Sequence, residues 1–495
     1  MVIFILVLNI LIYFVKQNCA NSSIQVFNPS NDEWNRDLVF FLTRRLGYSV
    51  DYDLMSEYLK FSPSDLVDKI IDEALSQEVK ADPGWADRTS TDFKNSGKNR
   101  FEFFRDHQRI FFNDVFNNGF REKLTVFWSN HFVTQYSGYS HPAYAFRYYN
   151  TIQKNVLGNF KDFVYEIGLD DAMLMYLNGY ENKNVAPNDN YSRELYELFT
   201  LGEGNGYTEN DIKETSRALT GFNSRVDQGP ISFTEKSFDD GEKTIFGRSG
   251  NWAYQDVIEI LFEEKKELIS KFICSKIYTH FVNPSVDEDF IEKLSEFFIE
   301  SEFNLETLLR KLFKSEHFFD SYNRSVLIKE PIDLLCSIHN QLKFSLLDDF
   351  DFDDFLLYGT ITMGQEILQP VDVAGWKGNH DWISTGTFPV RWEWTEWMIW
   401  EYWKSDQEQF RKLLKKLVPS DETNPKIIVK SFFRFLLCEF EINEQDLIDG
   451  IEVFKNDLPD IYFSDGTWNL DYDSASYQTC LLLMFILKLP EYQLK

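Results

Sequence analysis

The sequence predicts a mainly α fold, a multi-helical globular array with one small β-hairpin or flap. Two observations lead to this prediction. Apolar residues recur at helical spacing over most of the chain, and residues 222–250 instead alternate polar and apolar positions among Gly and Asp. The 495 residues are 43% hydrophobic and 17% aromatic, which is enough for a large core. A chain of this length is expected to divide into two or three subdomains.

The formal net charge of −29 excludes the function classes that need basic surfaces. Nucleic acids and anionic membrane surfaces are therefore not expected as partners. An acidic chain suits an exported protein and tolerates bound cations. The charge is equally consistent with an acidic, solvated surface and no further role.

Residues 2–15 form an apolar run, VIFILVLNILIYFV, which is shorter than the ~20 residues that a spanning helix needs. We interpret residues 1–20 as a signal peptide cleaved near Ala20, so the protein is expected to be exported (periplasmic, cell-surface or secreted). It would not span a membrane after cleavage. An uncleaved anchor is the alternative, because no positive residue precedes the run and Lys16 follows it.

The five cysteines are far apart and form no CxxC pair, which excludes a zinc ribbon or thioredoxin-like site. If export removes Cys19, four remain, and they either form disulfides or are buried as small apolar residues. These four are Cys274, Cys336, Cys438 and Cys480.

The first segment after the signal peptide, residues 21–98, begins with helices. A helix is predicted at 34–46, and Ser62-Pro63-Ser64-Asp65 is a helix start signal for the next. Residues 80–98 are polar and contain Gly and Pro, so a loop is expected there.

Residues 99–222 are predicted to form a central helical core. Leu124, Trp128 and His131 lie at i, i+4 and i+7, so His131 faces the core. A histidine on an apolar face is most often satisfied within the core. The other interpretation is a ligand or a proton-transfer group.

A helical hairpin with clear start and stop signals is predicted at residues 187–222. Gly202 is placed where a C-cap glycine ends the first helix, and Thr208 with Asp211 forms an approximate capping box for the second. Glu194 falls inside the apolar stripe of the first helix, where an unpaired carboxylate costs several kcal/mol. Either Glu194 pairs with an arginine, Arg193 or Arg217, or it acts as a ligand or as a general acid/base.

A β-hairpin or flap is predicted at residues 223–250. Its charged cluster of Asp239, Asp240 and Lys243 resembles a calcium loop in composition but lacks EF-hand spacing. Residues 251–400 are predicted to be a second helical region, and residues 401–495 the closing helices.

Residues 363–391 are predicted to be a structured loop, because Pro370, Gly375, Gly378 and Pro389 oppose a regular helix. Aromatic and polar side chains gather there, as is typical of a ligand-binding loop or of a core plug. Trp376 is expected to be buried. The gathered residues are Trp376, His380, Asp381 and Trp382.

Seven motifs together resemble a bacterial family known as domain of unknown function 1800. They are FLTRRLGYS (41–49), FWSNHF (127–132), VLGNFKDFVYEIGLDDAMLMYLN (156–178), NDNYSRELYELFTLGEGNGYTENDI (188–212), RALTGF (217–222), DDGEKTIFG (239–247) and QPVDVAGWKGNHDWI (369–383). The family pattern usually has a histidine at Ser129 and often one at Phe238. The resemblance implies export and a sulfatase-like partner protein, and it implies no established activity.

Two function hypotheses follow. The first is an exported enzyme for acid/base or metal-dependent hydrolysis of an envelope or extracellular polymer, because one neutral His with carboxylates suits either chemistry. GxSxG, HExxH and P-loop motifs are absent. The second is a non-catalytic helical scaffold that binds a sulfatase-like protein or a glycan.

The candidate site residues follow from the first hypothesis. The catalytic candidates are His131, Glu194 and Glu197, and a divalent metal ion would be held by His131 and Glu194. We expect these two side chains to meet, directly or through the ion. The alternative is that Glu194 pairs with an arginine and His131 bonds to a backbone carbonyl. The binding candidates are Asn190, Arg193, Trp376, His380, Asp381 and Trp382.

Overall fold

The computed structural model describes residues 21–437 and 442–495, and these residues confirm the mainly α prediction. Helices account for most of their length, and the β structure of these residues is limited to four strands of two or three residues and a few isolated bridges. The predicted signal peptide and Cys438 lie outside the described residues.

The helices up to the flap are α2 Arg36–Leu46, α3 Tyr52–Tyr58, α4 Pro63–Ser76, α5 Ser90–Asn95, α6 Arg100–Asn118, α7 Phe120–His131, α8 Tyr136–Tyr139, α9 Pro142–Asn155, α10 Phe160–Gly168, α11 Asp171–Tyr176, η1 Gly179–Glu181, α12 Asn190–Glu194, η2 Leu195–Thr200 and α13 Glu209–Ala218. Those that follow are η3 Glu235–Ser237, α14 Tyr254–Glu264, α15 Lys266–Phe281, α16 Glu288–Glu300, α17 Leu305–Phe313, α18 Glu316–Phe319, η4 Ser321–Asn323, α19 Pro331–Leu342, α20 Phe352–Thr362, η5 Asn379–Trp382, α21 Thr387–Ser405, α22 Glu408–Leu417, α23 Pro425–Leu436, α24 Glu444–Lys455, α25 Asp460–Ser464, α26 Ala475–Leu487 and η6 Pro490–Gln493.

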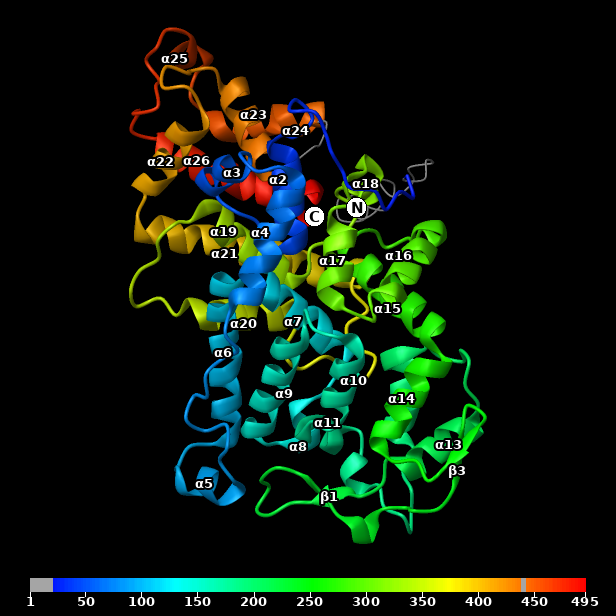
Figure 1. Ribbon diagram of the computed structural model, residues 1–495. Helices are drawn as coiled ribbons and strands as arrows, with labels where there is room; N and C mark the ends of the chain where they lie inside the picture. The colour runs from blue at the N-terminus through cyan, green and yellow to red at the C-terminus, as the bar shows by residue number, and fades with distance from the viewer. Residues whose placement is uncertain (1–20, 438–441) are drawn as a thin grey trace.

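The closing helices α22, α23, α24 and α26 pack on one another at one end of the molecule, beside α2 and α3 (Figure 1). Helices α6 and α8–α11 form the opposite end, and α14–α17 run along one side. Helix α7 lies between these groups and contacts α4, α6 and α9. This central position places α7 against both the N-terminal segment and the α9–α11 layer.

The β structure consists of two separate antiparallel pairs. Strand β1 (Phe222–Ser224) pairs with β2 (Ser232–Phe233), and β3 (Lys243–Ile245) pairs with β4 (Arg248–Gly250). Strand β3 packs on α13. The predicted flap is therefore two short hairpins, of which the second packs on α13 and the first on η1.

Local start and stop signals are placed as the sequence predicts. The Ser62 side chain caps α4, and Thr208 with Asp211 forms a complete capping box on α13. Gly202 adopts φ +91°, a conformation in which a side chain would be strained. The helix before it is irregular, because residues Leu195–Thr200 form a π-helix after α12. The predicted apolar stripe nevertheless persists, because Tyr191, Leu195 and Phe199 are buried and Leu198 is partly buried against the core.

Two loop predictions need correction. Residues 80–98 contain the short helix α5, capped by a Thr89–Asp92 capping box that the loop assignment overlooked. The structured loop ends before Thr387, where α21 begins, and Pro389 lies within the first turn of that helix. Proline is tolerated there because the first N–H groups of a helix have no intrahelical acceptor. The burial of Trp376 is confirmed, since 7% of its surface is exposed.

One large hydrophobic cluster extends through the described chain from Leu38 to Tyr492. A second, smaller cluster joins the structured loop to the C-terminal residues. It consists of Ile328, Trp376, Trp382, Phe388 and Leu494. The predicted division into segments 21–98, 99–222, 223–250, 251–400 and 401–495 stays a prediction.

A buried charge cluster lies between α7, α19 and the last residue of the chain. The Asp333 carboxylate accepts hydrogen bonds from the ammonium groups of Lys123, at 2.6 Å, and Lys495. The Arg45 guanidinium lies nearby and donates to the Lys495 carbonyl at 2.9 Å. Burial raises the pKa of Asp333, but the two lysines outweigh it and hold this pKa below its usual value. Burial lowers the pKa of Lys123 to about 8.

Of the four cysteines expected in the mature chain, Cys274, Cys336 and Cys480 are buried and unpaired. Within the described residues these three therefore behave as small apolar core residues. None of the described helices combines the length and apolar character needed to cross a membrane.

We expect the mature protein to begin near residues 20–22, because the apolar run at residues 2–15 is too short to span a membrane comfortably. Cleavage after Ala20 would place the new α-ammonium group of Asn21 beside a carboxylate. The backbone nitrogen of Asn21 lies 3.2 Å from Oδ2 of Asp320. N-terminal sequencing of the natively exported protein tests this expectation. An intact Met1 on the exported chain would contradict it.

Candidate functional site

The main candidate site is a cavity of about 390 Å³ that we call the motif cavity. It lies between α7, α15, the segment before α19 and the structured loop, so it joins the FWSNHF motif to the QPVDVAGWKGNHDWI motif. Its lining residues are Val126, Phe127, Asn130, His131, Lys276, Thr279, His280, Pro284, Leu327, Ile328, Glu330, Ala374, Trp376, Lys377, Gly378, Asn379, Trp382 and Lys495.

The Asn130 side chain fixes the loop wall of the motif cavity. Its Oδ1 accepts from the Trp376 backbone N–H at 2.6 Å, and its Nδ2 donates to the Trp376 carbonyl at 2.9 Å. Gly375 has φ +80°, and a Cβ there would lie 2.3 Å from Asn130 Oδ1. This contact requires glycine at position 375, because the backbone passes directly against the amide.

A histidine and a carboxylate meet in the motif cavity. His280 Nδ1 lies 3.5 Å from Oε1 of Glu330. The other Glu330 oxygen accepts from Nε2 of Gln365 at 2.7 Å, which fixes the carboxylate. Burial raises the pKa of Glu330 and lowers that of His280 well below its usual value. His280 is therefore a neutral base at physiological pH.

The charged groups of the motif cavity are mainly cationic, although the whole chain is strongly acidic. Lys276, Lys377 and Lys495 line it, and Glu330 is the single acidic side chain among the described lining residues. The Lys495 ammonium group pairs with Asp333 in the buried charge cluster. The ammonium groups of Lys276 and Lys377 form no ion pair with any described residue. Burial lowers the pKa of Lys276.

His131 lines the motif cavity and is neutral, because burial and the nearby Lys276 lower its pKa to about 3. Its Nε2 lies 3.0 Å from the Phe199 carbonyl oxygen. A carbonyl only accepts, so Nε2 carries the proton and Nδ1 keeps the lone pair. His131 is therefore bonded to a backbone carbonyl of η2, which is the alternative to a meeting with Glu194. No ion pair joins His131 to Glu194 in the described part of the chain.

Glu194 is half-buried at the end of α12, outside the motif cavity. Neither of the two arginines expected to pair with it does so. Arg193 pairs with Glu197 at 3.2 Å and Glu209 at 2.8 Å, while Arg217 pairs with other acids. Burial and the neighbouring Glu197 raise the pKa of Glu194. No described residue forms a hydrogen bond or ion pair with its carboxylate.

The remaining candidates divide between the motif cavity and the surface. Trp376 and Trp382 form part of the cavity wall, with ring centroids 6.3 Å apart. His380 and Asp381 lie on η5 between them and are exposed. Asn190 donates to Asn178 Oδ1 at 3.1 Å and is not among the residues that line the motif cavity.

Sequence analysis missed Lys276, His280 and Glu330. Lys276 and His280 are four residues apart on α15, so they share one helix face, and this spacing was a usable signal. Glu330 precedes Pro331, which marks the start of α19. Nothing in either local pattern indicates that the two segments meet.

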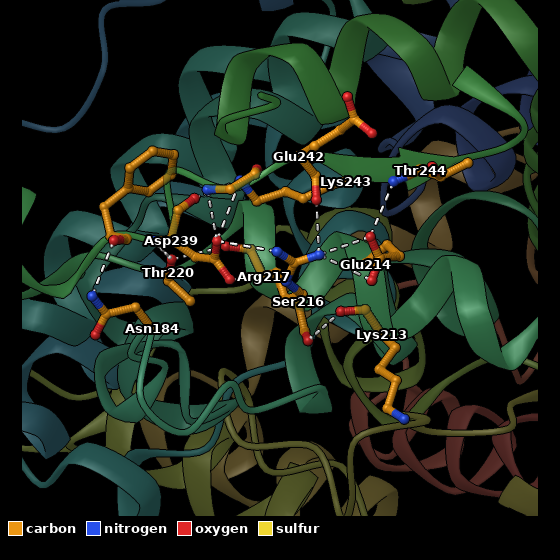
Figure 2. Close-up of polar contacts among 12 residues, drawn as sticks. Asn184, Lys213, Glu214, Ser216, Arg217, Thr220, Asp239, Glu242, Lys243 and Thr244 are labelled. Carbon is orange, nitrogen blue, oxygen red and sulfur yellow. Dashed lines mark hydrogen bonds and ion pairs between the residues drawn. The ribbon is translucent and has the colours of Figure 1, made fainter. Parts of the chain in front are cut away.

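The motifs RALTGF and DDGEKTIFG form a separate ion-pair network (Figure 2). The Arg217 guanidinium lies between Asp239, at 2.8 Å, and Glu214, at 2.9 Å. Lys243 donates to the Asp239 carbonyl at 2.5 Å, and Glu214 accepts from the Thr244 backbone. The charged cluster of the flap therefore fastens β3 to α13, and Asp239 is engaged by arginine.

The metal hypothesis has no further ligand to support it. Across residues 21–437 and 442–495, no group of three or more His, Cys, Asp or Glu side chains is arranged to hold a metal ion. His131 and Glu194, which no described hydrogen bond or ion pair joins, stay as the sequence-based candidates.

The fold and the motif cavity define a mainly α protein whose candidate site is a partly open cavity with three lysines among its lining residues. The chain belongs to the family described as protein of unknown function (DUF1800), whose profile matches residues 41–494. No curated protein and no solved structure matches the chain.

Proposed function

We propose that the protein is exported and binds an acidic carbohydrate of the cell envelope or extracellular matrix in the motif cavity. The observation that carries this proposal is the charge of the cavity. Lys276 and Lys377 supply cationic groups without ion-pair partners, in a chain whose net charge is −29. Unpaired ammonium groups in a partly enclosed cavity favour an anionic ligand.

The rest of the lining suits a ligand rich in hydroxyl and carboxylate oxygens. Asn379 accepts from the Ile328 N–H at 3.1 Å through Oδ1, which leaves its Nδ2 to donate to a ligand. Trp376 and Trp382 add an aromatic wall of the kind that packs against sugar rings. A volume of about 390 Å³ is within the range of small-molecule sites.

We expect the double variant Lys276→Met/Lys377→Met to bind trigalacturonate at least about tenfold more weakly than the unchanged protein, because hydrogen bonds to charged groups contribute about 1.5–3 kcal/mol each. Titration calorimetry on the purified exported protein measures this. Methionine keeps the apolar stem of lysine, so packing is largely retained.

Two controls accompany this measurement. Lys412→Gln changes a lysine whose side chain is 75% exposed on α22, and its affinity should match that of the unchanged protein. Cellotriose, which has no carboxylate, should bind more weakly than trigalacturonate. Equal affinity for both trisaccharides, or no loss in the double variant, would contradict the proposal.

The alternative is a non-catalytic helical scaffold that binds a sulfatase-like protein. No contact among the described residues bears on that partner. A pull-down with a purified sulfatase-like protein, in the presence and absence of saturating trigalacturonate, separates the two proposals.

A further inference from the structure

We propose that His280 is the general base of a hydrolytic reaction in the motif cavity, and that the bond cleaved is an ester on the bound acidic carbohydrate. This inference rests on the proposed function, because it takes the same ligand as substrate. It adds a reaction to what would otherwise be a binding site.

The surroundings of His280 orient its ring. The ring packs against Phe127, with centroids 5.0 Å apart, and against Phe281, at 4.6 Å. Its Nδ1 faces the Glu330 carboxylate, which accepts best from an N–H donor. The proton therefore belongs on Nδ1, and Nε2 keeps the lone pair. Nε2 forms no hydrogen bond to any described residue.

Glu330 is a positioning residue for His280. Gln365 donates to the Glu330 carboxylate at 2.7 Å, and Gln365 Oε1 in turn accepts from the Ile332 N–H at 3.0 Å. The bond from Ile332 fixes the side-chain amide of Gln365, and the bond from Gln365 fixes the carboxylate of Glu330. The arrangement sets the tautomer of the imidazole, and the negative charge of Glu330 partly offsets the burial and nearby cations that disfavour the imidazolium formed after proton transfer.

The lining of the motif cavity indicates which bond is cleaved. Among the described lining residues there is no Ser or Cys, and the Thr279 hydroxyl already donates to the Lys276 carbonyl at 3.1 Å. Water is therefore the nucleophile. Glycosidases of the common two-carboxylate type need a pair of acids, whereas Glu330 is alone here. A base with one positioning carboxylate suits addition of water to an ester carbonyl.

The reaction balances without a co-reactant. His280 Nε2 removes a proton from water as the water oxygen bonds to the ester carbonyl carbon. The carbonyl oxygen becomes negative beside Lys276, one turn before His280 on α15. The bond from the carbonyl carbon to the sugar oxygen then breaks. His280 returns its proton to that oxygen, which gives a carboxylic acid and a free sugar hydroxyl.

The test uses O-acetylated trigalacturonate and measures acetate release by the purified protein. The unchanged protein should release acetate with saturation kinetics above the buffer rate. His280→Gln should lower kcat about 100-fold or more, the usual effect of losing a general base, and keep its affinity for trigalacturonate within about twofold. Melting temperatures confirm that each variant is folded.

Glu330→Gln provides a second readout, and it also serves if His280→Gln does not fold. It should lower kcat, leave KM unchanged and shift the pH profile of kcat, which a merely structural role would not do. Lys412→Gln, on the exposed face of α22, should retain full activity.

The outcomes separate this inference from the proposed function. Binding of trigalacturonate without acetate release by the unchanged protein overturns the inference and leaves the binding function intact. Acetate release that persists in His280→Gln also overturns it. Failure to bind the trisaccharide overturns the proposed function and this inference together.

Discussion

Replacing Asp333 with asparagine is expected to lower the free energy of unfolding by about 3–5 kcal/mol, or to prevent folding altogether. The Asp333 carboxylate is buried and neutralises the ammonium groups of Lys123 and Lys495. Asparagine has nearly the same shape but no charge, so both cations would stay buried without an anion. Removing one member of a buried ion cluster costs more than a surface pair contributes.

Urea unfolding at neutral pH measures this change through the midpoint concentration. Asp354→Asn is the matched control, because Asp354 pairs with Arg109 at 2.6 Å on the surface, and both side chains are about 30% exposed. Its loss should stay below about 1 kcal/mol. A similarly small loss for Asp333→Asn would show that the lysines are stabilised by other means.

Four buried histidines and one buried aspartate are together expected to lower the stability of the protein by about 5 kcal/mol between pH 7 and pH 5. Burial lowers the pKa of His107 and His131 to about 3, and that of His141 and His339 to about 4. Each has a value near 6.5 when unfolded, so the unfolded chain binds more protons below pH 6.5. The free energy of unfolding therefore decreases as the pH is lowered, by about 2 kcal/mol per histidine between pH 7 and pH 5.

Asp170 opposes this loss. Burial and the neighbouring Asp171 raise the pKa of Asp170 to about 7, so its carboxyl group takes up a proton in the folded state first. A folded pKa above the unfolded value stabilises the protein as pH falls, here by about 2 kcal/mol. The four histidines together outweigh it.

Unfolding titrations in urea at pH 7 and pH 5 measure the difference. His107→Phe should reduce it by about 2 kcal/mol, because neither ring nitrogen of His107 has a hydrogen-bond partner in the described residues. Phe111→Leu, on the same helix, is a volume-changing control without a titratable group, and it should leave the difference unchanged. Equal stability of the unchanged protein at both pH values would contradict this prediction.

The parts of the fold that depend on local chemistry were predictable from the sequence. Periodicity predicts the helical class, and Ser62, Thr208 and Asp211 cap helices as expected because a cap needs only neighbouring residues. The family match over residues 41–494 likewise follows from linear motifs. Some local features were not predictable from the sequence, since the π turn at Leu195–Thr200 has no clear sequence signal.

The candidate site was only partly predictable. Trp376, Trp382 and His131 were recognised from their own segments, and all three line the motif cavity. Glu194 is predicted with them because it falls inside the apolar stripe of its own helix, and Glu197 because it lies at the edge of that stripe. A pattern within one helix indicates which side chains need a partner, and it does not say which segment supplies one.

The sequence by itself determined the helical class, the caps and turns, and the motif residues that could form a site. Only the tertiary structure decided that His280 meets Glu330, fifty positions away, and that Lys276 and Lys377 face the same cavity. The reason is physical. A cap or an amphipathic face is set by residues within a turn or two, whereas a site is set by how whole helices pack, and that depends on the summed burial of the entire core.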